Sequence, residues 1–254
     1  MRLRNIPRAA QTVAASPFVE QEPAAWRGRW QQRFGSEKPL HIEVGMGKGR
    51  FLMEMAAQNS QVNYIGLERY TSVLLRAVER RAAEEGGREP ESGVPGKEAG
   101  TCTFGDPQEE TSSRMPGNLL FLCEDAVRLP ELFAPGEVER IYLNFSDPWP
   151  KERHAARRLT SPAFLRRYEQ ILAPGGTIEC KTDNQALFDF SLASAAESGW
   201  QVTASTRDLH HDALGEGNVM TEYEEKFSAK GNPICKMVLK RPAEGDAQTT
   251  DASI

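Results

Sequence analysis

Long hydrophobic runs are missing from this chain of 254 residues. No stretch of about 18 uncharged apolar residues occurs, so we expect no membrane-spanning helix and no membrane partner. The N-terminus contains arginines but lacks the continuous apolar segment that a secretory signal needs. Both absences favour a cytoplasmic location.

Cysteine and histidine are scarce as well. The four cysteines lie far apart and form no CxxC pair, which argues against a zinc site and against a disulfide framework. His154, His210 and His211 make no ligand constellation with them, so no metal is expected. Reduced thiols agree with a cytoplasmic protein.

An excess of positive charge is also missing, since the formal net charge is −5. The acidic residues are unevenly placed, however. Residues 84–117 hold eight acids against three bases, and residues 244–254 hold three acids and no base. The remainder carries roughly +3, with arginine and lysine gathered in residues 2–8, 27–38 and 151–167. A local basic surface for nucleic acid is therefore compatible with the composition.

What the chain does have is a regular alternation of apolar patterns. With 39% hydrophobic and 26% charged residues, it can bury a globular core. From Leu40 to Asp189, strand-like runs alternate with helical periodicity, which predicts an α/β fold with a mostly parallel sheet. The predicted strands are residues 39–45, 63–69, 118–125, 138–147 and 175–183. The predicted helices are residues 50–58, 70–86 and 161–174, the last with glycines after its end. Residues 200–206 and 234–242 are expected as further strands that make an antiparallel C-terminal edge.

The domain organisation follows from these patterns. We predict one domain over residues 40–242, preceded by a basic and mostly flexible N-terminal arm, residues 1–39. Residues 84–117 are rich in Gly, Pro, Glu and Ser and poor in core-forming residues, so we interpret them as a disordered insertion. Residues 243–254 have the same character and are expected as an acidic flexible tail.

A glycine-rich turn follows the first strand in IEVGMGKGRFL, residues 42–52. Gly45, Gly47 and Gly49 allow a sharp turn and a close approach to a ligand, and the next helix offers its free N–H groups. This pattern is typical of a nucleotide-binding turn. The spacing is G-x-G-x-G and differs from the G-x-G-x-x-G of a dinucleotide site.

Acidic residues accompany this turn at the strand ends. Glu68 ends the second strand, where a carboxylate can accept both hydroxyls of a ribose. Asp125 ends the third strand and can contact an adenine, while Glu43 precedes the first glycine and suits a cationic ligand group. So much negative charge favours S-adenosylmethionine over a cofactor with a pyrophosphate. Taken singly, each acid is as readily explained as a helix N-cap or a solvated loop residue.

The stretch LNFSDPWPKERH, residues 143–154, follows the fourth strand. Asp147 lies at the carboxyl end of that strand, where ligands bind in open α/β sheets, and Pro148 keeps it extended. A basic band comes next, made of Lys151, Arg153, His154, Arg157 and Arg158. The band can be an ordinary solvated helix face. Beside a rigid acid, it also suits an RNA site in which the acid contacts a base edge and the cations hold phosphate.

Six segments together carry a family resemblance: EVGMGKG, GLERY, CEDA, FSDPWPKERH, ECKTDN and TEYEEKF. They resemble the bacterial TrmB-type tRNA (guanine-N7-)-methyltransferases from about Leu40 to Pro242, apart from the insertion, which is longer than expected for that family. The resemblance implies a Rossmann-like class I methyltransferase fold. It also implies S-adenosylmethionine as methyl donor and a guanine of the tRNA variable loop as acceptor, with 7-methylguanosine as product.

The resemblance assigns roles to individual residues. Asp147 is expected to be catalytic, and the cofactor-binding positions are Glu43, Gly45, Gly47, Glu68, Asp125 and Asp147. The substrate-binding positions are Lys151, Asp183, Thr221, Glu222, Tyr223 and Glu224. The RNA-binding positions are Arg153, His154, Arg157 and Arg158. By hypothesis, Asp147 and Asp183 accept hydrogen bonds from the guanine N1–H and amino groups.

Three other functions remain open on the sequence alone. A class I methyltransferase with a small-molecule or protein acceptor would need the glycine turn and Glu68, but not the loop at Asp147. A non-catalytic RNA-binding protein would not need the cofactor acids. A nicotinamide dehydrogenase is disfavoured by the glycine spacing. We expect tRNA as the partner, no obligatory protein partner, and either a monomer or a homodimer.

Overall fold

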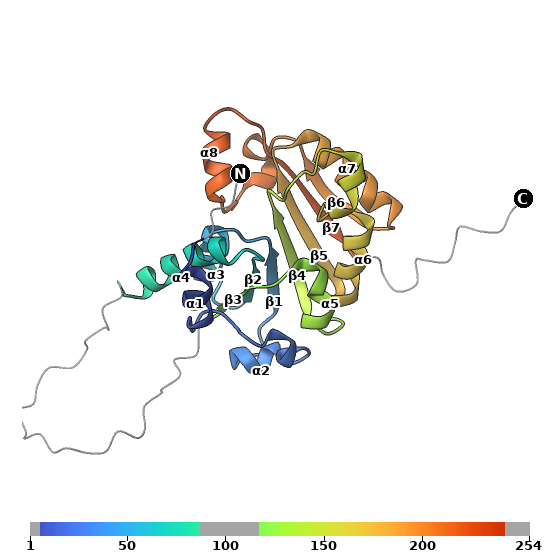
Figure 1. Ribbon diagram of the computed structural model, residues 1–254. Coiled ribbons are helices and arrows are strands. Elements are labelled where there is room, and N and C mark those ends of the chain that lie inside the picture. Colours follow the sequence, from blue (N-terminus) through green and yellow to red (C-terminus); the bar gives the residue numbers. More distant parts are fainter. Residues whose placement is uncertain (1–5, 87–116, 242–254) are drawn as a thin grey trace, which may run out of the picture.

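The computed structural model describes residues 6–86 and 117–241. A seven-stranded sheet forms the centre of these residues (Figure 1). The strand order is β3-β2-β1-β4-β5-β7-β6. The strands are β1 (Leu40–Val44), β2 (Asn63–Leu67), β3 (Leu119–Leu122), β4 (Val138–Asn144), β5 (Leu172–Thr182), β6 (Gln201–Thr206) and β7 (Cys235–Lys240). Strands β1 to β5 pair in parallel, whereas β7 runs antiparallel to both β5 and β6. The predicted fold class, including its antiparallel C-terminal edge, is confirmed.

Helices cover both faces of the sheet (Figure 1). The longer ones are α3 (Arg50–Gln58), α4 (Thr71–Gly86), α6 (Pro162–Ile171) and α7 (Gln185–Glu197). The shorter ones are α1 (Ala9–Ala14), α2 (Trp30–Phe34), α5 (Leu129–Leu132) and α8 (Glu222–Ser228), with 3-10 turns η1 (Pro23–Trp26), η2 (Ala126–Arg128), η3 (Glu152–Arg157), η4 (Leu209–His211) and η5 (Ala213–Gly215). α1, α3 and α4 pack on one face, and α5, α6 and α7 on the other. In residues 6–86 and 117–241, no helix combines the length and apolar character that crossing a membrane requires.

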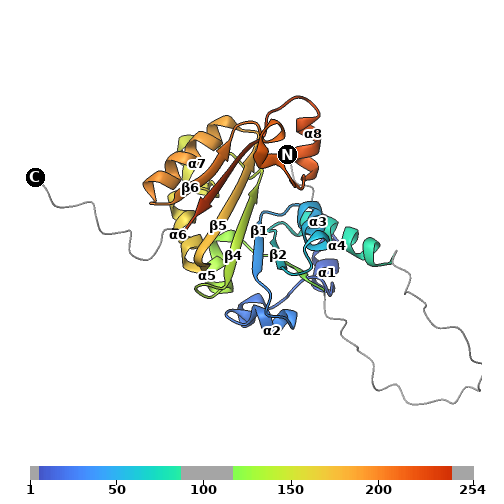
Figure 2. The same cartoon turned by 180° about the vertical axis from the view of Figure 1, so that it is seen from behind.

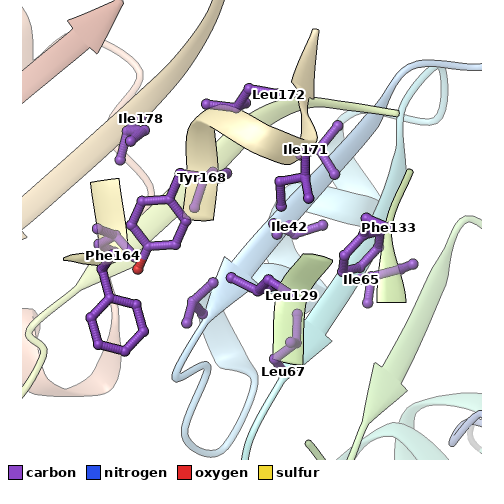
Figure 3. Packing of buried hydrophobic residues seen from close by; sticks show 14 of the residues in the cluster. Ile42, Ile65, Leu67, Leu129, Phe133, Phe164, Tyr168, Ile171, Leu172 and Ile178 are labelled. Atoms are coloured by element: carbon purple, nitrogen blue, oxygen red, sulfur yellow. The ribbon is translucent and has the colours of Figure 1, made fainter. Parts of the chain in front are cut away.

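The larger core lies between the sheet and the layer of α5 and α6 (Figure 3). Ile42, Ile65, Ile141 and Ile178 point into it from neighbouring strands and are fully buried. Helices cover both faces of the sheet, so β1 and β2 are buried along their whole length, although β1 carries the polar residues His41 and Glu43 on either side of Ile42. Burial of this surface removes apolar area from water and stabilises the sheet. The carboxyl ends of its parallel strands are thereby held in fixed positions.

The N-terminal segment differs from its prediction. Residues 6–39 are not mostly flexible: Val13 is buried against α4, and Trp30 is 1% exposed, with its indole N–H donating to the Leu132 carbonyl at 2.9 Å. Phe18 and the residues after it extend the sheet at β3, where the Phe121 N–H donates to the Phe18 carbonyl at 2.9 Å. The apolar residues here are too irregularly spaced to show a helical or strand period, which is why the pattern predicts no packing.

Two predicted segments fall mainly on residues outside those the structure describes. Of the predicted insertion, residues 84–117, the first three residues belong to α4 and residue 117 precedes β3. The predicted acidic tail, residues 243–254, lies entirely outside the described ranges. The predicted disorder of both segments remains a prediction.

A buried hydroxyl in the core generates a stability prediction. Tyr168 is fully buried, and its hydroxyl has no hydrogen-bond partner among the described residues. Because an unsatisfied buried polar group costs about 1–3 kcal/mol, we expect Tyr168→Phe to raise the free energy of unfolding by about 1 kcal/mol. Urea denaturation of both proteins measures this difference. Tyr142→Phe is the control, since it removes a hydroxyl that does contact His41 at 3.3 Å and should lower stability. A loss of stability in Tyr168→Phe would show that its hydroxyl has a partner.

Candidate active site

A cavity of about 210 Å³ opens where β1 and β4 end. Its walls are the glycine turn after β1, the first residues after β4, and the start of α8; the lining residues are Glu43, Gly45–Phe51, Asn144, Phe145 and Thr221–Tyr223. Segments from three distant parts of the chain therefore meet in one place. Ligands of open α/β sheets bind at this edge, at the point where strand order reverses on either side of β1 and β4.

The glycine turn has the backbone shape that the sequence predicts. Gly45, Gly47 and Gly49 have φ of 78°, 59° and 76°, a region that side-chain-bearing residues rarely adopt. A Cβ at Gly45 or Gly47 would meet nothing within 4 Å, so these two are needed for backbone conformation and leave open space above the turn. A Cβ at Gly49 would lie 3.2 Å from Ala77 on α4 and is restricted by packing as well.

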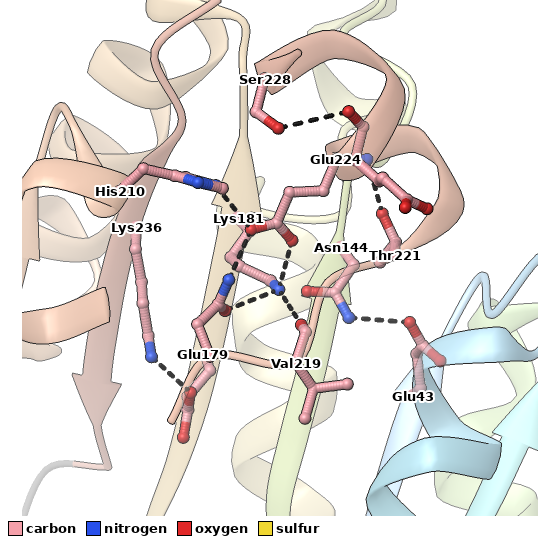
Figure 4. Close-up of polar contacts among 12 residues, drawn as sticks. Glu43, Asn144, Glu179, Lys181, His210, Val219, Thr221, Glu224, Ser228 and Lys236 are labelled. Atoms are coloured by element: carbon pink, nitrogen blue, oxygen red, sulfur yellow. Dashed lines mark hydrogen bonds and ion pairs between the residues drawn. The ribbon is translucent and has the colours of Figure 1, made fainter. Parts of the chain in front are cut away.

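Glu43 supplies a buried carboxylate to this cavity. Its Oε1 accepts a hydrogen bond from Asn144 Nδ2 at 2.8 Å, and its Oε2 has no partner among the described residues (Figure 4). Burial raises the pKa of Glu43 to about 7. A buried carboxylate with one free oxygen in a cavity is suited to receive a cationic donor, because such a ligand would satisfy the oxygen and neutralise the charge.

The other two strand-end acids are held by backbone groups. Glu68 Oε2 accepts from the Gly47 N–H at 3.2 Å and Oε1 from the Tyr70 N–H at 2.9 Å, so this carboxylate fastens the end of β2 to the glycine turn. Burial raises the pKa of Glu68. Asp125 caps η2 by accepting from the Val127 N–H at 3.0 Å, and its other oxygen lies 3.4 Å from Arg69. The N-cap interpretation of Asp125 is therefore correct, and its side chain stays partly exposed.

The loop that carries Asp147 is strained on both sides. Phe145 and Trp149 have φ of 51° and 41°, and among the described residues they are the two non-glycine positions with positive φ. Such conformations cost about 1–3 kcal/mol each and persist only where surrounding contacts enforce them. Arg158 is one enforcing contact, since its guanidinium donates to the carbonyls of Pro148 and Trp149, both at 3.1 Å. Asp147 is exposed within this fixed loop.

Arg158 therefore differs from its predicted role. The sequence places it among the RNA-binding residues, but it is 8% exposed, its guanidinium holds the loop, and it stacks on Phe190 at 4.2 Å. The rest of the basic band stays on the surface. Arg157 lies over the Trp149 ring at 5.0 Å and His154 meets the same ring edge-on at 5.6 Å, so two of the predicted RNA-binding residues form one patch around this tryptophan.

Helix α8 brings two predicted substrate residues together. The Tyr223 hydroxyl donates to Asp183 Oδ2 at 3.2 Å, and the Tyr223 ring lies 4.9 Å from the Phe145 ring. Thr221 caps α8 by accepting from the Glu224 N–H at 3.0 Å. The Tyr223 ring also stacks on the Phe227 ring, with the centroids 4.1 Å apart, and the residue as a whole is 42% exposed.

Glu224 also differs from its predicted role. It is fully buried and forms an ion pair with Lys181 at 2.6 Å, while its other oxygen contacts Asn218 and His210. In this structure both oxygens of the carboxylate are occupied by these partners and none of it reaches the surface. The sequence does not reveal this, because the partner lies 43 residues away.

Several lining residues are missed by the sequence patterns. Lys48 and Arg50 form ion pairs with Glu222 and Glu225 across the cavity mouth, and Asn144 orients Glu43. The only signal for the two cations is their place within the glycine turn. Across the described ranges, no cluster of three or more His, Cys, Asp or Glu side chains could hold a metal ion.

Comparison with known proteins decides the family. A family model described as "Putative methyltransferase" matches residues 37–237. A tRNA (guanine-N(7)-)-methyltransferase of Lachnoclostridium phytofermentans is 48% identical over 96% of this chain and 100% of its own length. This chain belongs to the tRNA (guanine-N(7)-)-methyltransferase family. A second member, from Geobacillus sp., is 46% identical over 95% of this chain and 96% of its own.

Solved structures agree with this family at the level of the fold. The 16S rRNA methyltransferase KamB superposes with a TM-score of 0.56 at 15% identity, covering 84% of this chain and 93% of that one. An antibiotic-related methyltransferase superposes with a TM-score of 0.53, also at 15% identity, over 84% and 92%. At such identities the likeness extends to the fold alone. The resemblance found in the six sequence segments is confirmed, and the dehydrogenase alternative is excluded.

The buried carboxylate of this family member generates a pH-dependent prediction. The pKa of Glu43 is higher in the folded protein than in the unfolded chain, so the folded protein binds a proton more tightly at this position. The free energy of unfolding of the wild type therefore falls as pH rises from the ordinary carboxyl range to about 7. Glu43→Gln removes that loss. We expect its free energy of unfolding to exceed that of the wild type by about 2–3 kcal/mol near pH 8 and by much less near pH 5.

Urea denaturation of the ligand-free proteins at both pH values measures the difference. Glu179→Gln is a suitable control, because Glu179 is paired with Arg140 at 2.8 Å and with Lys236 at 3.2 Å and should be less stable as the amide. A gain in Glu43→Gln that is equal at both pH values would contradict a protonated Glu43 at low pH.

Proposed function

We propose that this protein transfers the methyl group of S-adenosylmethionine to N7 of a guanine in the variable loop of tRNA. The observation that supports it best is the shared cavity. The free oxygen of Glu43 and the open glycine turn form one side, and the Phe145–Tyr223 pair with Asp183 adjoins the other. A donor site and an acceptor site are thus adjacent, as direct group transfer requires.

The donor side fits S-adenosylmethionine on the chemistry of its residues. Glu43 Oε2 would accept from the amino group, and the open backbone at Gly45 and Gly47 admits close contact. Glu68 keeps unused lone pairs on both oxygens that would accept from ribose hydroxyls, and Asp125 would contact the adenine. When bound, S-adenosylmethionine supplies a methyl group activated by a positively charged sulfur. The acids of this site would repel a pyrophosphate-bearing cofactor.

The acceptor side needs little acid–base chemistry. Guanine N7 has a free lone pair at neutral pH, so no general base has to act before it, and the protein mainly orients the base. Asp147 and Asp183 would accept hydrogen bonds from the N1–H and amino groups, a donor pair that adenine lacks. Methylation leaves positive charge on the purine, which a fixed carboxylate stabilises as it develops. Tyr223 holds one oxygen of Asp183 and leaves the other for the base.

The RNA chain would be held beside this site by the exposed basic patch. Lys151, Arg153 and Arg157 are exposed and follow the Asp147 loop directly. Their charges suit phosphate, and the Trp149 ring adds an aromatic surface. Arg158 contributes indirectly, by holding the loop in shape. We place the reaction in the cytoplasm, where tRNA is available, and we propose that no protein partner is required.

The acceptor role of Asp183 is testable by substitution. In Asp183→Ala, we expect the rate of 7-methylguanosine formation on unmodified tRNA to fall at least about 100-fold, since the base loses a fixed carboxylate. Affinity for S-adenosylhomocysteine should stay within about twofold, because Asp183 lies outside the donor side. The assay uses labelled S-adenosylmethionine, bulk unmodified tRNA and nucleoside analysis.

Asp189→Ala is the matched control, because Asp189 is exposed on the neighbouring helix and pairs only with the exposed Arg207 in the described residues. Undiminished 7-methylguanosine formation by Asp183→Ala would refute the assigned role. If the wild type methylates another acceptor and leaves tRNA unmethylated, the proposed function is refuted.

The two neighbouring arginines should respond differently to removal. Arg157→Ala is expected to weaken tRNA binding and to reduce the slope of log affinity against log salt by about one. Arg158→Ala should instead lower the free energy of unfolding by about 1–3 kcal/mol, because two loop carbonyls lose their donor. Filter binding at several salt concentrations and urea denaturation distinguish the two. Equal salt slopes in wild type and Arg157→Ala would remove Arg157 from the RNA contacts.

A further inference from the structure

Lys181, near the carboxyl end of β5, is 5% exposed, and a lysine is rarely so buried. Its ammonium group donates to Asn218 Oδ1 at 3.1 Å, to the Val219 carbonyl at 2.8 Å and to Glu224 Oε2 at 2.6 Å (Figure 4). All three acceptors come from one segment, residues 218–224. The three protons of the ammonium group are therefore spent on docking that segment against β5.

Glu224 completes the network from the other side. Its second oxygen accepts from Asn218 Nδ2 at 2.6 Å and lies 3.1 Å from His210 Nε2. A fully buried ion pair often adds no net stability over an apolar pair of the same size, because both charges must leave water. We therefore infer that this ion pair positions residues 218–224 more than it stabilises the fold.

The pair arranges the acceptor side of the site. Glu224 lies in the first turn of α8, directly after Tyr223, which reaches Phe145 and Asp183. The remaining ties of α8 to the glycine turn and α4 are exposed or half-exposed ion pairs of Glu222 and Glu225. Exposed pairs contribute little and are screened by salt, so the buried pair is the main anchor of this seven-residue helix.

Lys181 also faces the donor side. It pairs in register with Asn144 of β4, and Asn144 donates to Glu43 on β1, so the three residues form a row across the sheet (Figure 4). The charges that act on Glu43 are Lys181, which favours its ionised form, and Glu68, which opposes it. The groups around Lys181 are Glu224, Glu43 and Lys236, with the Phe51 ring 5.1 Å from its nitrogen.

We propose that Lys181 is a positioning residue for methyl transfer, which with Glu224 fixes the segment that carries Tyr223 and with its charge supports the ionised carboxylate of Glu43. This inference rests on the proposed function and deepens it. One buried cation thereby serves both halves of the site: it holds the acceptor wall in place and it keeps the donor carboxylate ready for a cationic ligand group. His210 contributes by fixing the far oxygen of Glu224.

The test separates the two roles with two variants. Lys181→Met/Glu224→Gln replaces the ion pair by a neutral pair of similar size, and Glu224→Gln alone keeps the cation. Both are checked by urea denaturation. The ionisation of Glu43 is followed in the ligand-free proteins by ¹³C NMR of its carboxyl carbon as pH is varied. Steady-state kinetics give KM for tRNA and kcat, and calorimetry gives the affinity for S-adenosylhomocysteine at each pH.

In the double variant, we expect the titration midpoint of Glu43 to rise by roughly half a unit or more, because a nearby opposite charge is lost. Affinity for S-adenosylhomocysteine near pH 7 should fall severalfold and recover at higher pH. In Glu224→Gln, the titration midpoint of Glu43 should stay the same or fall. KM for tRNA should rise about tenfold in both variants, because α8 loses its buried anchor. Lys236→Met is the matched control, since Lys236 pairs in register with Lys181 one strand further from Glu43.

Folded variants with the wild-type Glu43 titration and wild-type KM for tRNA would overturn the proposal, as would an equal upward shift in Glu224→Gln. If the double variant does not fold, Glu224→Gln alone decides through its titration and its KM. Failure of the proposed function gives a different result: the wild type forms no 7-methylguanosine, whereas the titration of Glu43, which needs no tRNA, still answers whether Lys181 acts on it.

Discussion

The hydrogen bond from Asn144 to Glu43 joins β1 and β4 at the place where the sheet changes the direction of its winding. On one side the chain proceeds through β2 and β3, and on the other through β5. Loops that leave the two strands must therefore diverge and leave a crevice between them. The Asn144 amide bridges this crevice and holds the Glu43 carboxylate at its base. The glycine turn, the Asp147 loop and α8 all surround this hydrogen bond.

Much of this arrangement is predictable from the sequence because it depends on local patterns. Apolar runs of strand length, broken by glycine turns and helical periods, are sufficient for the parallel sheet and its edge. The glycine turn and the strand-end acids are predictable for the same reason, since topology alone brings strand ends together. The packing of the N-terminal segment is not predictable in this way. Phe18 and Trp30 contact residues about a hundred positions away in the sequence, and the apolar residues of the segment follow no regular period.

The same limit explains the two residues whose predicted roles differ from the structure. Arg158 and Glu224 lie within motifs rich in polar residues, and a sequence shows a charge without showing whether water reaches it. In the structure each charge is turned inward, one against loop carbonyls and the other against Lys181. Motif residues of this kind shape the site without entering it, and only the three-dimensional partners distinguish them from residues that face a ligand.

The N-terminal segment has a further consequence for how the molecule behaves among its own copies. Exposed strand edges offer unpaired backbone groups that other chains can join, a common route to aggregation. At β3 this edge is already occupied, since Phe18 and Glu20 take up hydrogen bonds with Phe121. The opposite end of the sheet is formed by β6 (Figure 2). Its register with β7 is irregular near Val202, which interrupts the regular strand geometry of that edge. A protein shortened by its first twenty residues would lose the first of these protections and become prone to self-association.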